Sequence, residues 1–220
     1  TLPSLLFFGF VYFKYNEELP KGTSGPEADV LAQKMLRAVH HEAYQNTDYL
    51  EWTFKGIHHY KWNKAKQHVD VSWENIVVML NIQEPEKSIV KRNDIEVVGD
   101  ATTPLIEKAV GYFNNDSFWL VAPHKVFDDG VTRSIVTQED GSEALLVTYS
   151  KGGNTPGDSY LWILDETGLP VKYKMWVSII PIGGVEATWE DWKTTESGVL
   201  LPAKHQLRIM ELDMGNVKAW

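Results

Sequence analysis

The side chains best suited to catalysis or metal binding are seven histidines, four of which form the pairs His40–His41 and His58–His59. A zinc site built on one helix uses histidines four positions apart, because these share a face. Adjacent histidines point about 100° apart on a helix and to opposite faces on a strand. One member of each pair could meet the other across a helix and a sheet. The favoured interpretation is a surface position near a helix end, so we expect no metal ligands.

The carboxylates and glycines also lack the spacing of a catalytic site. Asp128–Asp129 and Glu190–Asp191 are adjacent pairs, which splay apart on a strand and serve paired acid–base work poorly. The sequence contains no G-x-S-x-G, G-x-G-x-x-G or phosphate-loop motif. The glycine-rich residues 151–157 join two expected strands and open no helix. The sequence therefore predicts no catalytic residue and no cofactor, and we expect the protein not to be an enzyme.

Composition excludes further classes of protein. The 220 residues include no cysteine, so disulfides, thiolate metal sites and cysteine nucleophiles are ruled out. The net charge is −9, which argues against nonspecific nucleic-acid binding, because neutralising phosphates requires a basic surface. The length fits one large domain or two small ones.

Aromatic and aliphatic side chains are the more informative residues. The chain holds nine tryptophans, which either line a core and cavity or form a stacking platform for sugars or bases; the first interpretation is favoured. Residues 179–184 read IIPIGG at an expected hairpin tip. An apolar tip indicates a covered surface, and a membrane, a partner or a cavity lid all remain open. The contact residues predicted there are Ile179, Ile180 and Ile182.

Residues 2–13 form an uncharged apolar run, LPSLLFFGFVYF. Such a run fits the second half of a membrane-anchor helix, the core of a signal peptide, or an apolar strand. The aromatic and basic residues 12–15 that end it favour the anchor. We therefore expect residues 1–15 to belong to a membrane anchor, residues 16–25 to be a linker, and residues 26–220 to form a single β domain. The predicted membrane or partner contacts are Leu5, Phe7, Phe8 and Phe10.

The best helix signal follows the linker. Ser24 precedes Glu27 by three residues, with Pro26 between them, which is typical of a capped helix start. An apolar stripe at a spacing of four predicts that this helix continues to about residue 46. A second, shorter helix is expected over residues 103–114.

The rest of the chain predicts about ten short antiparallel strands. Turn signals such as Asp140–Gly141 and Gly183–Gly184 separate the expected strands, among them residues 49–54, 68–73, 118–121 and 159–164. Several strands, residues 160–164 among them, are apolar without alternation, so both faces must be covered. The predicted fold class is mainly β, with α+β character: one strongly curved antiparallel sheet, an incomplete barrel, with a long N-terminal helix and a shorter second helix packed against it.

Two segments carry a family resemblance. Residues 161–172 read LWILDETGLPVK, and residues 189–193 and 197–202 read WEDWK and SGVLLP. They resemble two successive elements of the bacterial lipoprotein-carrier superfamily, the LolA/LolB/RseB-like proteins: a strand and acidic turn with Thr-Gly-hydrophobic-Pro, then an aromatic strand with Gly-apolar-Pro. By layout the similarity extends over roughly residues 26–210. The N-terminal run and the tryptophans at 52, 62 and 73 look like an uncharacterised membrane-anchored subgroup.

The resemblance implies a noncatalytic protein of the bacterial cell envelope, anchored in the membrane with its domain on the periplasmic side. It implies a curved sheet around a hydrophobic cavity, in which a lipid or acyl chain binds between helix and sheet. The alternative is an accessory subunit that docks onto a larger membrane protein complex. The side chains expected to line the cavity are Leu31, Met35, Trp62, Trp119, Trp162, Trp176 and Trp189.

Overall fold

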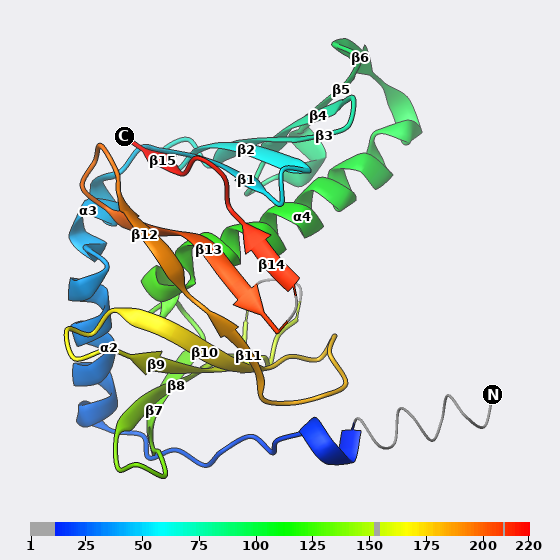
Figure 1. The fold of residues 1–220 in the computed structure, drawn as a ribbon. Coiled ribbons are helices and arrows are strands. Elements are labelled where there is room, and N and C mark those ends of the chain that lie inside the picture. The colour runs from blue at the N-terminus through cyan, green and yellow to red at the C-terminus, as the bar shows by residue number, and fades with distance from the viewer. Residues whose placement is uncertain (1–11, 152–154, 209) are drawn as a thin grey trace, which may run out of the picture. The chain divides into compact units, whose positions relative to one another are not determined.

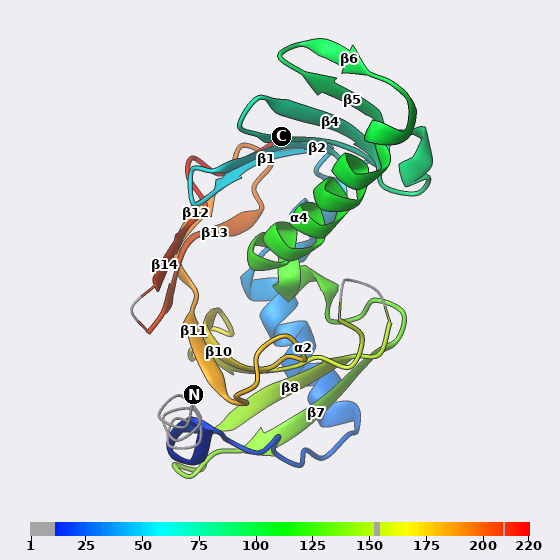
Figure 2. The ribbon, with the colours of Figure 1, turned by 90° about the vertical axis from the view of Figure 1, so that its right-hand side faces the viewer.

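The structure is a computed structural model that describes residues 12–151, 155–208 and 210–220 (Figures 1 and 2). These residues form two compact units. Unit 1 consists of the described parts of Thr1–Ala38, Lys125–Trp189 and Gln206–Met210. Unit 2 consists of Val39–His124, Glu190–His205 and Glu211–Trp220.

Unit 1 is a five-stranded antiparallel sheet with one helix packed against it. The strand order is β11-β10-β9-β8-β7, so each strand pairs with its neighbour in sequence. The helix α2 (Pro26–Ala38) packs against β7 and β8 and buries Ala28, Ala32, Met35 and Leu36. This spacing places small and apolar side chains on one helix face. The strands are β7 (Val131–Thr137), β8 (Glu143–Tyr149), β9 (Ser159–Leu164), β10 (Pro170–Trp176) and β11 (Val185–Thr188).

The turn between β9 and β10 lies directly on α2. Gly168 has a φ of +97°, and a Cβ atom there would lie 3.0 Å from the carbonyl oxygen of Lys34. Only glycine fits this left-handed position without displacing the helix backbone. The Asp165 carboxylate accepts the backbone N–H groups of Thr167 and Leu169, each at 2.9 Å. Burial alone would raise the pKa of Asp165, but these hydrogen bonds and that of the Thr167 hydroxyl lower it. The Asp-Glu-Thr-Gly segment is therefore a helix-docking turn.

Unit 2 contains a seven-stranded antiparallel sheet in the order β15-β1-β2-β3-β4-β5-β6. The helix α4 (Thr103–Val121) packs against β3 and β4, and the short helix α3 (His41–Asn46) precedes β1. The 3-10 turns are η1 (Pro85–Lys87), η2 (Gly99–Ala101) and η3 (Ala122–Lys125). The strands are β1 (Tyr49–Phe54), β2 (His58–Asn63), β3 (His68–Trp73), β4 (Ile76–Asn81), β5 (Ile89–Arg92), β6 (Ile95–Val97) and β15 (Lys218–Ala219).

Alternating burial explains why these segments form a sheet with one covered face. On β1, the side chains of Leu50, Trp52 and Phe54 are buried, and the residues between them are half-buried. Trp52 stacks on Tyr60 of β2 with ring centroids 4.5 Å apart. Phe113 of α4 lies 6.4 Å from Trp52 by the same measure, so the aromatic core joins sheet and helix.

A three-stranded sheet completes the fold, mostly within unit 2. Its order is β12-β13-β14, formed by β12 (Glu190–Thr194), β13 (Leu200–Leu207) and β14 (Met210–Asp213). Lys204 and Glu211 form an ion pair of 2.7 Å between β13 and β14.

The mainly β, antiparallel fold class is confirmed, but its finer details are corrected. The strands of the described residues divide among three open sheets and do not form one curved sheet of about ten strands. The second helix, α4, is longer than α2 and includes residues 118–121, which were predicted as a strand.

The first helix also differs from its prediction at both ends. It stops at Ala38 because His40 adopts a left-handed φ of +56°, after which α3 begins. At its start, the carbonyl of Gly25 accepts the N–H groups of Ala28 and Asp29. Among the described residues, Ser24 makes no capping hydrogen bond, so the predicted cap is wrong.

Candidate functional site

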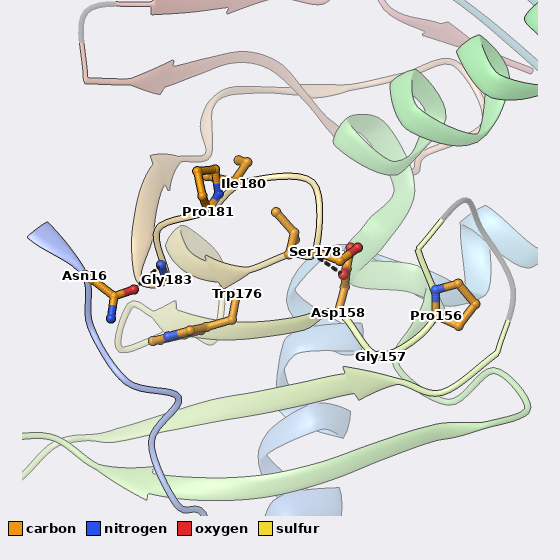
Figure 3. A pocket seen from close by; sticks show the side chains of 10 residues that line it. Asn16, Pro156, Gly157, Asp158, Trp176, Ser178, Ile180, Pro181 and Gly183 are labelled. Carbon is orange, nitrogen blue, oxygen red and sulfur yellow. Dashed lines mark hydrogen bonds between the residues drawn. The ribbon is translucent and has the colours of Figure 1, made fainter. Parts of the chain in front are cut away.

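An open hollow of about 390 Å³ lies in unit 1, where the β10–β11 connection meets the N-terminal segment (Figure 3). It brings together two residues predicted for different roles: Trp176 from the expected cavity lining and Ile180 from the expected contact surface. The other lining residues come from the loop before β9, from the connection itself and from residue 16. The full lining is Asn16, Pro156, Gly157, Asp158, Trp176, Val177, Ser178, Ile180, Pro181 and Gly183.

Glycine at position 183 makes this arrangement possible. A Cβ atom on Gly183 would lie less than 3 Å from the indole of Trp176 and from the carbonyl oxygen of Glu17. Real Cβ atoms do not approach other heavy atoms so closely, so any other residue would separate the two. The Gly-Gly turn signal therefore marks a close approach between segments far apart in sequence.

Hydrogen bonds attach the N-terminal segment to this connection. The N–H of Glu17 donates to the carbonyl of Gly183 (3.0 Å), and the N–H of Gly183 donates to the Asn16 side-chain oxygen (2.9 Å). The indole N–H of Trp176 donates to the Glu17 carbonyl at 2.8 Å. The Glu17 carboxylate pairs with Lys174 of β10 at 2.7 Å. Residues 16 and 17 are therefore fixed along the end of β10.

Exposed apolar side chains flank the attachment on both segments. Ile179 on the connection is 72% exposed, and Phe13, in a helical segment at residues 12–15, is 88% exposed. The guanidinium of Arg208 lies 4.3 Å from the centre of the Tyr15 ring. Ile182, like Ile180, is half-buried. The predicted contacts Leu5, Phe7, Phe8 and Phe10 lie outside the described residues.

Asp158 supplies the charge in the hollow. It is 5% exposed, and its Oδ1 accepts the N–H of Ser178 at 2.9 Å. Its Oδ2 accepts the hydroxyl of Thr155. Figure 3 shows the Asp158 side chain beside Ser178, with Trp176 and Pro156 on either side in this view. In the described part of the chain, the ion pairs involve other carboxylates. The hollow thus combines a buried carboxylate with aromatic and apolar walls.

The other predicted cavity residues of unit 1 form packed core. Trp162 and Trp189 are 0% and 2% exposed, and their ring centroids are 4.9 Å apart. Tyr173 meets Trp162 edge-on at 5.0 Å. On α2, Met35 is fully buried and Leu31 is half-buried. These aromatic side chains therefore pack against one another in the core of unit 1.

The two remaining tryptophans of the predicted set, Trp62 and Trp119, belong to unit 2. Trp62 meets Phe113 edge-on at 5.2 Å, and Trp119 contacts His205 at 5.2 Å. Both take part in side-chain packing within that unit.

Unit 2 contains a buried polar network that was not predicted from the sequence. Asp116 of α4 is 1% exposed and accepts hydrogen bonds from His58 Nδ1 (2.7 Å) and the Tyr60 hydroxyl (2.5 Å). Burial and the neighbouring Asp116 raise the pKa of Tyr60 well above its usual value. His58 is stacked on Tyr112 and borders a second hollow of about 470 Å³. Its predicted surface position is therefore wrong.

The histidine at position 41 also has an unexpected partner. His41 Nδ1 lies 3.2 Å from His124 Nδ1, and the His124 ring stacks on Tyr44 at 4.2 Å. Burial first, and then the charges of His41 and Lys64, lower the pKa of His124 well below its usual value. Burial likewise lowers the pKa of Lys64 to about 8. Within the described ranges, no group of three or more metal-ligating side chains is arranged to hold an ion.

Comparisons with known proteins give a weak structural likeness. The sequence matches no protein-family profile and no curated protein. Among solved structures, a DUF1329 family protein from Desulfovibrio piger is similar over 87% of this chain and 92% of its own. The sequence identity is 10% and the TM-score is 0.45. Such a likeness supports no functional conclusion, and the resemblance to lipoprotein carriers stays a prediction.

No helix among the described residues combines the length and the apolar character needed to cross a bilayer.

Proposed function

We propose that this chain is a noncatalytic protein of the bacterial cell envelope that works at a membrane surface. The edge of unit 1 formed by residues 12–17 and 176–184, here called the apolar edge, contacts the lipid. The observation that carries the proposal is the attachment of the N-terminal segment to the β10–β11 connection through Glu17 and Gly183. The described residues 12–17 of the N-terminal segment thus lie beside the connection that carries Ile179, Ile180 and Ile182, on one edge of unit 1.

The side-chain chemistry of this edge supports a lipid surface. Phe13 and Ile179 are the most exposed apolar residues on the two segments. Tyr12 and Tyr15 are 47% and 38% exposed, and Lys14 follows Phe13 directly. Aromatic rings with a nearby basic side chain are typical of the interface between lipid and water.

Packing favours this surface over an interior ligand site. Trp162, Tyr173 and Trp189 contact one another in the core of unit 1. The hollow at Trp176 and Ile180 is, by contrast, open. A lipid group in that core would have to displace packed rings, whereas a group at the apolar edge would cover exposed carbon atoms.

Vesicle partitioning of the full chain tests the proposal. We expect Ile179→Asp to weaken partitioning about tenfold, because burial of an isoleucine contributes roughly 1.5–3 kcal/mol. Ile95→Asp is the matched control, since Ile95 on β6 of unit 2 is 73% exposed compared with 72% for Ile179. Equal partitioning of the two variants would contradict the proposal. Wild-type protein that binds no vesicles would favour the alternative, docking onto a membrane protein complex.

A further inference from the structure

Asp158 has an unusual electrostatic position at the apolar edge. A carboxylate that is only 5% exposed is costly to bury without a compensating positive charge. The lining of its hollow includes no lysine, arginine or histidine. Across the described ranges, the two lysines of β10 pair with other carboxylates: Lys172 with Glu186 and Lys174 with Glu17.

The hydrogen bonds of Asp158 use only part of its accepting capacity. Ser178 donates its N–H to one oxygen and Thr155 donates its hydroxyl to the other. Two carboxylate oxygens together offer about four acceptor positions. Both donors are electrically neutral, so the negative charge at the hollow is stabilised but not compensated.

The walls around this carboxylate fit an organic cation. Trp176 supplies an aromatic ring, and cations bind favourably over the faces of tryptophan rings. Ile180, Pro181 and Pro156 supply apolar contacts for the carbon atoms of such a cation. An anion would be repelled by Asp158, and a small metal ion would gain nothing from aromatic and aliphatic walls.

We propose that this hollow binds an alkylammonium group, with Asp158 as its counter-ion and Trp176 as its aromatic wall. Two sources share this chemistry: the headgroup of an ethanolamine or choline lipid, and a free amine. The lipid source rests on the proposed function, because the hollow lies at the apolar edge. The free amine does not depend on it.

The competing interpretation is that Asp158 only braces the loop before β9 against the β10–β11 connection. The variant Asp158→Asn distinguishes the two interpretations. Its amide keeps an oxygen that can accept the Ser178 N–H, but it carries no negative charge. Asp165→Asn is the matched control. Asp165 also braces a turn of unit 1 through backbone N–H groups, and its substitution changes the net charge equally.

The first experiment measures partitioning of the full chain into phosphatidylglycerol vesicles with and without phosphatidylethanolamine. We expect phosphatidylethanolamine to strengthen binding, and Asp158→Asn to remove this gain of about tenfold while leaving binding to phosphatidylglycerol alone unchanged. Asp165→Asn should behave as wild type. Thermal unfolding of each variant confirms that it is folded. A headgroup preference that persists in Asp158→Asn would overturn the lipid assignment.

The second experiment titrates the same proteins with ethanolamine and with tetramethylammonium by calorimetry. Saturable amine binding that Asp158→Asn weakens about tenfold supports the ammonium site. If the protein binds amines in this way but binds no vesicles, the result contradicts the proposed function and leaves the ammonium site standing. Vesicle binding without headgroup preference, together with no heat from either amine, would refute the ammonium site and leave the proposed function standing.

Discussion

The pH dependence of stability provides a direct test of the buried histidine in unit 2. His124 is 5% exposed, and its pKa is lowered by burial and by the charges of His41 and Lys64. The folded protein therefore keeps this ring neutral at pH values where the unfolded chain binds a proton, below about 6.5. Because the folded pKa is the lower one, His124 contributes stability above about pH 6.5 and that stability is lost as the pH falls.

The size of the effect follows from proton linkage. Each pH unit below 6.5 removes at most about 1.4 kcal/mol, so between pH 8 and pH 5 the loss from this one group is at most about 2 kcal/mol. His124→Phe removes the titration and retains a flat ring to stack on Tyr44. It also replaces a buried Nε2 that, among the described residues, has no hydrogen-bond partner. We therefore expect the variant to lose less stability than wild type over this interval, by up to about 2 kcal/mol.

Urea unfolding at a series of pH values from 8 to 5 measures this difference. As the pH falls from 8 to 5, the free energy of unfolding of His124→Phe should fall less than that of wild type, whichever protein is more stable at pH 8. His59→Asn is the control, since His59 is exposed on β2, and it should follow the wild-type profile. Identical pH slopes for wild type and His124→Phe would refute the assignment of a neutral buried imidazole.

Two further predictions concern stability. Gly183→Ala should lower the free energy of unfolding by roughly 1–3 kcal/mol, measured by urea unfolding, and should detach the N-terminal segment from the connection, measured by limited proteolysis. Gly111→Ala is the control: its added Cβ meets open space in α4, so it should not destabilise the protein. Tyr60→Phe should cost roughly 1–3 kcal/mol, because Asp116 loses a hydrogen bond of 2.5 Å in a buried position; a calorimetric melt equal to wild type would contradict that role.

Several strands were predicted accurately because the residues within each hairpin are enough to specify it. Residues 49–54, 68–73 and 159–164 were predicted with the bounds that the structure has. Alternation of buried and less buried side chains, with glycine or asparagine at each turn, specifies such hairpins without reference to the rest of the chain. The division of these hairpins among three sheets depends on contacts between distant segments, such as Leu50 of β1 with Ala219 of β15.

The error in α4 has a specific physical cause. Asn114, Asn115 and Asp116 form a polar run that would ordinarily end a helix, so residues 118–121 were assigned to a strand. In the structure the helix continues because His58 and Tyr60 of β2 donate hydrogen bonds to Asp116. A tertiary contact thus overrides the local preference, and no pattern within the helix could reveal it.

The same limit applies to the candidate site. Trp176 was predicted as one of the cavity-lining tryptophans. Ile180 was predicted as a contact residue because an apolar hairpin tip indicates a covered surface. Asp158 was not selected, because its significance depends on burial and on the charges around it. A lone aspartate before a strand is indistinguishable in sequence from an ordinary turn residue.

The attachment of residues 16 and 17 couples the position of the N-terminal segment to the walls of the hollow. Glu17 accepts the indole N–H of Trp176, and Asn16 accepts the N–H of Gly183. Both Trp176 and Gly183 line the hollow, as does Asn16 itself. Displacement of the N-terminal segment therefore removes one wall and frees the aromatic ring of another. A ligand that depends on these walls stabilises the attached state, and by linkage the attached state strengthens ligand binding by the same factor.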